Sequence, residues 1–278
     1  MTAIEFDRVS RDFATPDGRP YRALDEISFA VSAGSFVAIV GPSGCGKSTL
    51  LNIAAGLLTP SSGRLLVGDP PAELHGDLNT NATYMFQQDA LLPWKTVRAN
   101  VALGLTLGGV ARPEAHARAE AWLERVGLAA FAAHYPSKLS GGMRKRVAMA
   151  QNWIIDRGIL LMDEPFSALD VHTRLRMETE LLTLWEGRSA GQASPNRKTV
   201  VFVTHDLEEA IALADEVIVL SAGPAARVVA RHHVTLDRPR DLMELRTSQA
   251  FVDLYGAIWV VLREEVIKSQ RSAEASRG

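Results

Sequence analysis

A glycine-rich segment between a strand-like run and a helix-like run restricts the fold of this chain more than any other feature. It reads Gly41-Pro42-Ser43-Gly44-Cys45-Gly46-Lys47-Ser48-Thr49, after the apolar run Phe36–Val40 and before the stretch Leu50–Leu58. The glycines allow successive backbone N–H groups to face one point, and the following helix directs its positive end to that point. Lys47 can add a charge there, and the Ser48 hydroxyl can hold Mg²⁺. The segment therefore predicts a phosphate-binding loop in an α/β domain.

Composition limits the compartment and the partners. The chain has 278 residues, 47% of them hydrophobic, with a net charge of −2 and one cysteine, Cys45. This length supports one large core, and the charge argues against a nucleic-acid partner, which would require a basic surface. A single cysteine cannot form an internal disulfide, so we expect a reducing compartment. Residues Met1–Asp7 lack the pattern of a signal peptide, and the apolar stretches are shorter than the ~20 residues of a membrane span. We therefore expect a cytosolic protein that reaches a membrane only through a partner.

The N-terminal half predicts strands and then helices. The expected strands are Ile4–Val9, Glu26–Val31, Phe36–Val40, Gly63–Gly68 and Ala82–Phe86, with a turn at Thr15–Pro20. From Val97 to Ile155 alanine, leucine and charged residues dominate, and Pro113, Gly127 and Ser140 stand at expected helix boundaries. This pattern predicts a helical lobe inserted into an α/β core.

Strands and helices alternate again after the helical lobe. The expected elements are strand Ile159–Met162, helix Thr173–Trp185, strand Thr199–Val203, helix Leu207–Ala214 and strand Val217–Leu220. This order is typical of a parallel sheet with crossover helices. The small, polar segment Gly187–Arg197 predicts a surface loop, and Pro239–Gly278 predicts an amphipathic helix with a polar tail.

An acidic pair follows a predicted buried strand. Asp163 and Glu164 come directly after Ile159–Met162, at the carboxyl end of the strand, where ligands bind in α/β proteins. Asp163 can reach a Mg²⁺ ion held by Ser48, and Glu164 can orient a water molecule for attack on a γ-phosphate. An exposed acidic turn is the alternative. Together with the glycine-rich loop, the pair favours phosphate chemistry.

Two further polar residues follow strand-like runs. Gln87 comes after Tyr84-Met85-Phe86 and could bind Mg²⁺ or the attacking water through its amide oxygen, although Gln88 makes the assignment ambiguous. His205 comes after Val200–Thr204 and could contact a γ-phosphate, although a single histidine is more often structural. In a parallel sheet the carboxyl ends of strands share one edge, so we expect both residues near the phosphate-binding loop.

A second anion-binding segment is Ser140-Gly141-Gly142, at the start of a predicted helix. Ser140 suits the N-cap position, and the glycines expose backbone N–H groups at the positive helix end. Arg144, Lys145 and Arg146 follow in the first turn, where cations are unfavourable unless an anion is near. Either these three residues are solvated or an anion compensates them.

The order of these motifs resembles the nucleotide-binding subunit of ATP-binding cassette (ABC) transporters over about the first 220 residues. The resemblance implies an RecA-like P-loop NTPase fold, with a parallel-sheet core, an N-terminal antiparallel β subdomain and an inserted α-helical subdomain. It also implies a role for each motif. Gly41 to Thr49 would be the Walker A loop, Asp163 the Walker B acid, Glu164 the catalytic base, Gln87 the Q-loop glutamine, Leu139 to Met143 the signature, Ser167-Ala168-Leu169-Asp170 the D-loop and His205 the switch histidine.

The resemblance also implies ATP and Mg²⁺ as ligands and a homodimer in which each ATP lies between the Walker A loop of one protomer and the signature of the other. Gly41 to Thr49, Ser140 to Gly142 and Asp170 would then contact nucleotide, with Ser48, Gln87 and Asp163 at the metal. Phe13 or, alternatively, Tyr21 would stack on adenine. Met143 departs from the glutamine more common in the signature, and we expect activity to survive this change.

A finer resemblance is to the nitrate, sulfonate and taurine importer branch. Leu91–Val97, Asp163–Asp170 and Arg238-Pro239-Arg240 carry it. It implies an ATPase at the cytoplasmic face of the membrane that contacts a transmembrane permease through the region after Gln87, with an extracytoplasmic solute-binding protein acting indirectly. An importer of a different small solute, a P-loop phosphotransferase and a soluble cassette ATPase are the alternatives. We expect an ATPase domain over residues 1–235, its helical subdomain at about 97–157, and a C-terminal extension over 236–278.

Overall fold

Two β-sheets organise the fold. The computed structural model describes residues 1–16, 18–68, 71–167, 169–187 and 197–275. Within these residues, a six-stranded sheet has the order β10-β9-β3-β8-β7-β6, and a four-stranded sheet has the order β2-β1-β4-β5. The strands of the first are β10 (Val228–His233), β9 (Glu216–Leu220), β3 (Phe36–Val40), β8 (Thr199–Val203), β7 (Ile159–Asp163) and β6 (Ala82–Met85). Those of the second are β2 (Pro20–Ser32), β1 (Thr2–Ala14), β4 (Ser62–Val67) and β5 (Ala72–Glu73).

The larger sheet is parallel from β9 to β6, and β10 is its one antiparallel strand. The smaller sheet is antiparallel throughout. Because successive side chains of a strand point to opposite faces, the five buried residues of β3 divide between two cores. Phe36, Ala38 and Val40 face one core, and Val37 and Ile39 face the other. This division places the end of β3 between two packed layers.

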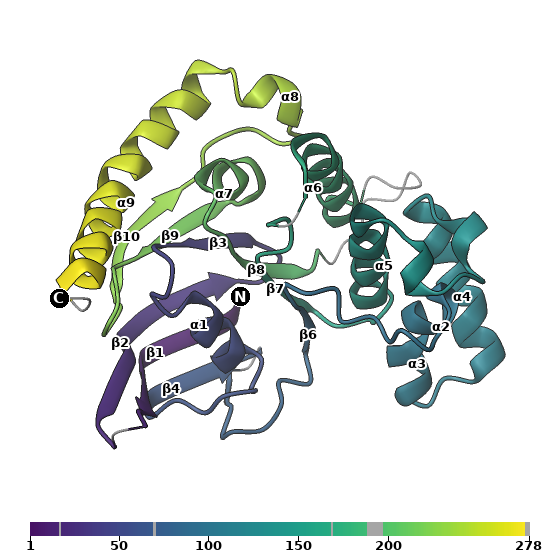
Figure 1. Cartoon of the computed structure of the whole chain (residues 1–278), viewed down its shortest axis with the longest axis horizontal. Helices are drawn as coiled ribbons and strands as arrows, with labels where there is room; N and C mark the ends of the chain where they lie inside the picture. The colour runs from purple at the N-terminus through teal and green to yellow at the C-terminus, as the bar shows by residue number, and fades with distance from the viewer. Residues whose placement is uncertain (17, 69–70, 168, 188–196, 276–278) are drawn as a thin grey trace.

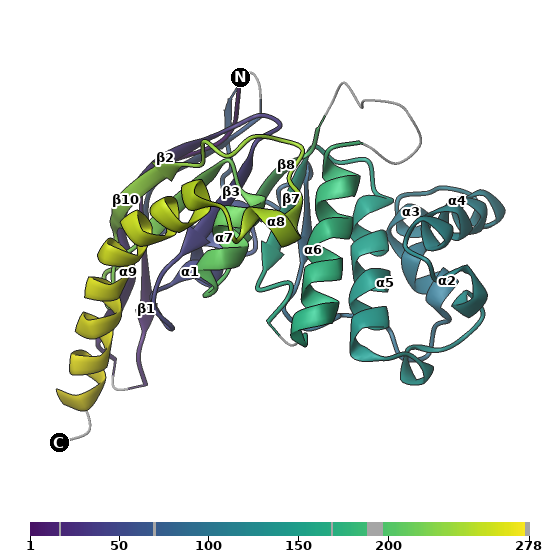
Figure 2. The same ribbon diagram turned by 90° about the horizontal axis from the view of Figure 1, so that it is seen from above.

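Different elements cover the two faces of the larger sheet (Figures 1 and 2). Helix α1 (Lys47–Ala54) and the antiparallel sheet share one core, whereas α6 (Val171–Trp185), α7 (Leu207–Leu213) and α9 (Gln249–Ala275) share the other. Helices α2 (Val97–Val101), α3 (Leu103–Leu107), α4 (Arg112–Arg125) and α5 (Gly141–Trp153) extend to one side. They enclose an apolar cluster of their own, and α5 also packs on the main core through Ala148, Met149 and Trp153.

The predicted fold class is confirmed, and several element boundaries are corrected. The predicted helix Leu50–Leu58 begins earlier and ends earlier, because α1 spans Lys47–Ala54. Gly56 ends it with a φ of 72°, and a Cβ there would lie 2.1 Å from the backbone oxygen of Asp77. A close approach of backbone to backbone therefore fixes the helix end, which apolar periodicity could not indicate.

The C-terminal region differs from its prediction in two respects. The single helix expected over Pro239–Gly278 is divided into α8 (Leu242–Leu245) and α9, and Ser248 accepts a hydrogen bond from the Phe251 N–H where α9 begins. Strand β10 was not predicted, since its sequence has three polar residues in six. Residues 188–196 of the predicted surface loop, Ala168 of the D-loop segment and residues 276–278 of the tail lie outside the described residues.

Candidate functional site

The glycine-rich loop joins β3 to α1 and folds against its own lysine. Gly44 and Gly46 have φ values of 76° and 97°, a conformation that glycine adopts without strain. Lys47 is 6% exposed, and its ammonium donates to the backbone oxygens of Gly41 and Pro42 at 2.8 and 3.0 Å. Ser43, Gly44 and Ser48 are exposed, and Gly46 and Thr49 are half-buried. The loop therefore presents glycine backbone and a serine hydroxyl at the carboxyl end of β3.

Cys45, within the loop, has a structural position. Its side chain is 1% exposed, and its sulfur would lie 2.9 Å from a Cβ placed on Gly41. Burial raises the pKa of the Cys45 thiol, which keeps it protonated and unreactive. Only the backbone of Cys45 is available to a ligand in the loop.

Asp163 lies beside Ser48, as the sequence predicts, although 115 positions separate them. The Ser48 hydroxyl donates to Asp163 Oδ1 at 3.0 Å, and the Tyr84 hydroxyl donates to Oδ2 at 3.2 Å. Burial raises the pKa of Asp163, while these two hydrogen bonds oppose the shift. A carboxylate beside a hydroxyl is a donor set that suits Mg²⁺, which binds proteins through few oxygen ligands.

Tyr84 is a residue that the sequence reasoning did not assign. It lies on β6, and burial together with the nearby Asp163 carboxylate raises the pKa of its hydroxyl. Its position three residues before Gln87, on a strand that pairs with β7, is the signal that could have identified it.

Glu164 lies in contact with Gln87 and His205, the other two polar residues predicted at this edge of the sheet. The Gln87 amide donates to Glu164 Oε2 at 3.1 Å, and His205 Nδ1 lies 3.4 Å from the same oxygen. Glu164 also has a φ of 42°, which costs a non-glycine residue about 1 kcal/mol or more. Strain of this kind is concentrated at functional sites, and here it turns the Glu164 carboxylate toward side chains that follow β6 and β8.

Ser140 caps helix α5, as predicted. Its hydroxyl accepts from the Met143 N–H at 3.3 Å, and a Cβ on Gly142 would lie 2.7 Å from Thr173 Cγ2 of α6. In the described part of the chain, no hydrogen bond or ion pair joins residues 139–143 to residues 41–49. Asp170 caps α6 by accepting from the Thr173 N–H, and hydrogen bonding to Thr173 lowers the pKa of Asp170.

The three basic residues after the signature are compensated by internal acceptors, which decides between the two alternatives. Lys145 is 3% exposed, and its ammonium lies 2.5 Å from the backbone oxygen of Gln87 and 3.4 Å from Asp89 Oδ1. Arg144 pairs with Asp89 Oδ2 at 3.0 Å, and Arg146 donates to the Val126 backbone oxygen at 3.1 Å. An anion of the chain itself, the Asp89 carboxylate, therefore compensates Arg144 and Lys145, whereas a backbone oxygen takes the Arg146 hydrogen bond.

The aromatic residues proposed to stack on adenine lie opposite each other. Phe13 of β1 and Tyr21 of β2 are direct cross-strand partners, so their side chains share one face of the sheet. The Arg11 guanidinium lies over the Phe13 ring at 4.8 Å. A Cβ on Gly223 would lie 3.7 Å from the Tyr21 hydroxyl and 3.3 Å from the Gly44 oxygen, so the Tyr21 hydroxyl lies near the glycine-rich loop.

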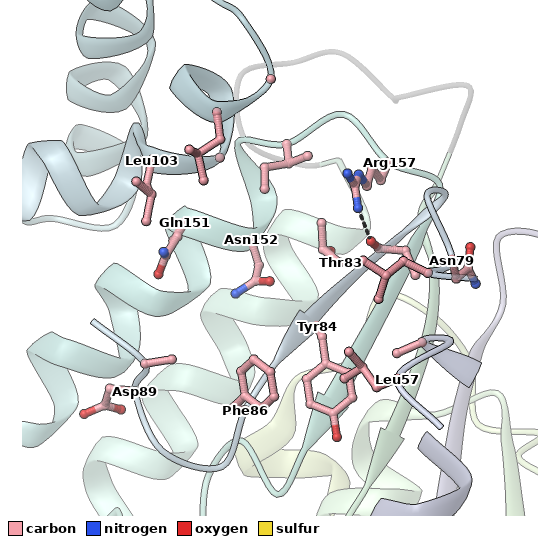
Figure 3. Close-up of a pocket in the computed structure, with 18 residues that line it drawn as sticks. Leu57, Asn79, Thr83, Tyr84, Phe86, Asp89, Leu103, Gln151, Asn152 and Arg157 are labelled. Atoms are coloured by element: carbon pink, nitrogen blue, oxygen red, sulfur yellow. Dashed lines mark hydrogen bonds between the residues drawn. The ribbon is translucent and has the colours of Figure 1, made fainter. Parts of the chain in front are cut away.

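A cavity of about 580 Å³ opens between β6 and the helical region (Figure 3). Phe86 and Tyr84 line it from β6 and the segment that follows, and Leu103 and Leu107 line it from α3. Asp89 also lines this cavity, which we call the groove, and its carboxylate pairs with Lys145. Phe86 and Leu107 are 46% and 79% exposed, which leaves an apolar surface uncovered beside the site.

The segment after Gln87 divides between core and surface. Leu91 packs against the core, whereas Trp94 is 71% exposed. No helix within the described ranges has the length and apolar character to cross a lipid bilayer.

The fold and the site define a P-loop ATPase: a glycine-rich loop between a strand and a helix lies at one edge of a parallel sheet with the carboxylates of Asp163 and Glu164. Comparison with known proteins identifies the family. Residues 24–167 match the family model described as ABC transporter. The chain therefore belongs to the ABC transporter family, as an ATP-binding, ATP-hydrolysing subunit.

Individual relatives agree with this assignment. The taurine import ATP-binding protein TauB of Rhizobium johnstonii is 42% identical over an alignment of 263 residues, and the match covers 93% of this chain and 96% of that protein. A dimeric ATP-binding cassette solved in a post-hydrolysis state with ADP and Pi is 30% identical, with a TM-score of 0.71, and the match covers 84% of this chain and 100% of that chain. The protein cbiO1 of Clostridium perfringens, part of the ABC transporter complex cbiONQ, is 25% identical, with a TM-score of 0.69 over 84% of this chain and 89% of that chain.

Proposed function

We propose that this chain is the ATPase subunit of an importer for a small solute that is an anion or carries an anionic sulfonate group, such as nitrate, an aliphatic sulfonate or taurine. The observation that carries the proposal is the apolar groove beside the hydrolytic carboxylates. Its wall contains Asp89, which pairs with Lys145, and Lys145 binds the backbone of Gln87. The Gln87 side chain in turn donates to Glu164, so a permease helix in this groove would contact a chain of three polar contacts that ends at Glu164. The similarity to a taurine import protein supports the solute class.

We propose that the residues around Glu164 carry out hydrolysis. Glu164 accepts the proton of the attacking water, and Gln87 and His205 hold its carboxylate in place. Ser48 and Asp163 would hold Mg²⁺, which supplies positive charge that neutralises the triphosphate. The backbone of Gly41 to Thr49 binds the phosphates where it reaches the surface, at Ser43, Gly44 and Ser48, and Phe13 or Tyr21 provides an aromatic face for adenine.

We propose further that two copies close around ATP. The glycines at the start of α5 offer backbone N–H groups to an anion, and the contacts of Ser140 stay within its own helix. The dimeric cassette among the structural relatives supports this arrangement, and the transporter complex that contains cbiO1 supports a permease partner. Asp170, at the start of α6, would lie at the same interface. The division into residues 1–235, a helical subdomain at about 97–157 and an extension over 236–278 is part of this proposal.

Co-purification with a membrane permease tests the function. Reconstituted with that permease and its solute-binding protein, the chain should hydrolyse ATP faster when taurine is added. Leu107→Glu places a charge in the groove. Because the Leu107 side chain is 79% exposed, folding and basal hydrolysis should be retained, while binding of the permease should be lost. Stimulation by other solutes, but by neither sulfonates nor nitrate, would reject the solute class. If the double variant Leu107→Glu with Phe86→Glu still binds the permease, the groove is not the permease-binding site.

A further inference from the structure

The connection between β9 and β10 forms a wall behind the phosphate-binding loop. We name residues 221–227 the β9–β10 turn. A Cβ on Gly41 would lie 3.1 Å from the backbone oxygen of Leu220, directly before the turn. A Cβ on Gly223 would lie 3.3 Å from the Gly44 oxygen, so the turn and the loop are in close backbone contact. Any movement of the turn therefore changes the space available to the loop.

The far end of the β9–β10 turn is attached to strand β2. The Ala226 N–H donates to the Ala23 oxygen at 3.1 Å, and the Asp25 N–H donates to the Ala226 oxygen at 2.9 Å. The Arg227 guanidinium also pairs with the Asp25 carboxylate. These contacts fix the second half of the turn to the antiparallel sheet.

The first half is held by the C-terminal helix. Glu265 of α9 is 5% exposed, and its Oε2 accepts from the Ala222 N–H at 2.8 Å. Its Oε1 accepts from Lys268, whose side chain is 61% exposed. Helix α9 is itself anchored, because Phe251, Ile258 and Leu262 are buried in the core that α9 shares with α7, and it runs beside β10 (Figure 1).

We propose that Glu265 is a positioning residue for nucleotide binding. Through Ala222 and Gly223, helix α9 holds the β9–β10 turn in place, and the phosphate-binding loop packs against this turn. Removing the Glu265 acceptor leaves the Ala222 N–H without its partner in a half-buried place, and the turn must shift to find water. The loop backbone at Gly44 then loses its close neighbour and becomes less preorganised for phosphates. The C-terminal extension thus contributes to nucleotide affinity without touching the nucleotide. This inference rests on the proposed role of residues 41–49.

Four variants of the full-length chain test whether Glu265 acts on the phosphate-binding loop through Ala222 and Gly223. Glu265→Leu removes the acceptor, and Glu265→Gln keeps an oxygen for Ala222 while removing the charge. Gly223→Ala presses a methyl group against the Gly44 oxygen. Gly256→Ala, on the same helix with nothing within 4 Å of the added Cβ, is the matched control for α9 itself. The measurements are the Kd for a non-hydrolysable ATP analogue with Mg²⁺ by calorimetry, the KM and kcat for ATP, and the Tm.

Glu265→Leu and Gly223→Ala should each raise Kd and KM by about 3- to 30-fold and leave kcat at saturating ATP nearly unchanged, the range expected for coupling through packed contacts. Glu265→Gln and Gly256→Ala should bind as the parent does. The double variant Glu265→Leu with Gly223→Ala should be less than additive, because both act on one contact. An unchanged Kd in Glu265→Leu, with or without a lower Tm, would overturn the inference, as would a Glu265→Gln defect equal to that of Glu265→Leu. A parent chain that fails to bind the analogue would instead reject the proposed nucleotide site.

Discussion

Lys145→Met tests whether helix α5 holds Glu164, the proposed catalytic base, through Gln87. The Lys145 ammonium is 3% exposed and donates to the Gln87 backbone oxygen, and the Gln87 side chain donates to Glu164. Methionine fills a similar volume and offers no donor. The variant therefore removes the link between α5 and Gln87 with little change in packing.

The structure sets the size of the effect. A fully buried carbonyl that loses its partner costs about 1–3 kcal/mol, and the hydrogen bond to the Gln87 oxygen is part-buried, so its loss lies in the lower part of this range. Removing one partner of a fully buried ion pair would cost about 3–5 kcal/mol, but Asp89 is 21% exposed on its side chain and retains Arg144. We therefore expect a loss in the free energy of unfolding of about 2 kcal/mol. Burial lowers the pKa of Lys145, and the Asp89 carboxylate opposes this shift.

The assay is steady-state ATP hydrolysis together with thermal unfolding. We expect kcat to fall by about 3- to 30-fold, since Gln87 would no longer be fixed on Glu164. Arg146→Gln is the matched control, because Arg146 lies in the same helical turn but donates to the Val126 oxygen instead. It should lose stability without the same loss of kcat.

A double-variant cycle separates this link from a general packing effect. Gln87→Ala keeps the backbone oxygen but has no amide to position, so adding Lys145→Met to it should lower stability further while leaving kcat where Gln87→Ala put it. Fully additive losses in kcat, or an undiminished kcat in Lys145→Met alone, would refute the reasoning.

Three further predictions follow from the same contacts. Glu164→Gln should bind ATP and dimerise but hydrolyse it about 10²- to 10⁴-fold more slowly, as measured by phosphate release; parent-like turnover would exclude Glu164 as the base. Ser140→Arg should leave ATP binding by single chains intact and abolish ATP-dependent dimers in light scattering, whereas intact dimers would exclude the signature from the interface. Gly56→Ala should lower the free energy of unfolding by about 3 kcal/mol or more in urea titrations, because its Cβ would lie 2.1 Å from the Asp77 oxygen. Gly109 has a φ of 88° and open space around it, so Gly109→Ala should cost only about 1 kcal/mol. Equal losses in the two variants would contradict this account.

Much of the site could be predicted from the sequence, because its signals are local. The phosphate-binding loop lies within nine consecutive residues, and Asp163 and Glu164 follow an apolar strand directly. In a parallel sheet, the carboxyl ends of strands meet at one edge, so the alternation of strands and helices by itself predicts that Gln87, Asp163 and the glycine-rich loop lie near one another. The structure joins Ser48 to Asp163 and Gln87 to Glu164 at that edge. The helix start at Ser140 was predictable for the same reason, since an N-cap depends on a hydroxyl and the next three residues.

The tertiary structure alone decided the contacts between residues that no local pattern connects. Lys145 has the sequence of a basic helix start, and only the fold places Asp89 and the Gln87 oxygen against it, 56 and 58 positions away along the chain. The positive φ of Glu164, the hydrogen bond from Tyr84 to Asp163 and the attachment of Glu265 to Ala222 are of the same kind. Periodicity and capping report the energy of a segment with its own neighbours, whereas these features depend on which surfaces meet when the layers pack, and that is settled by the whole chain at once.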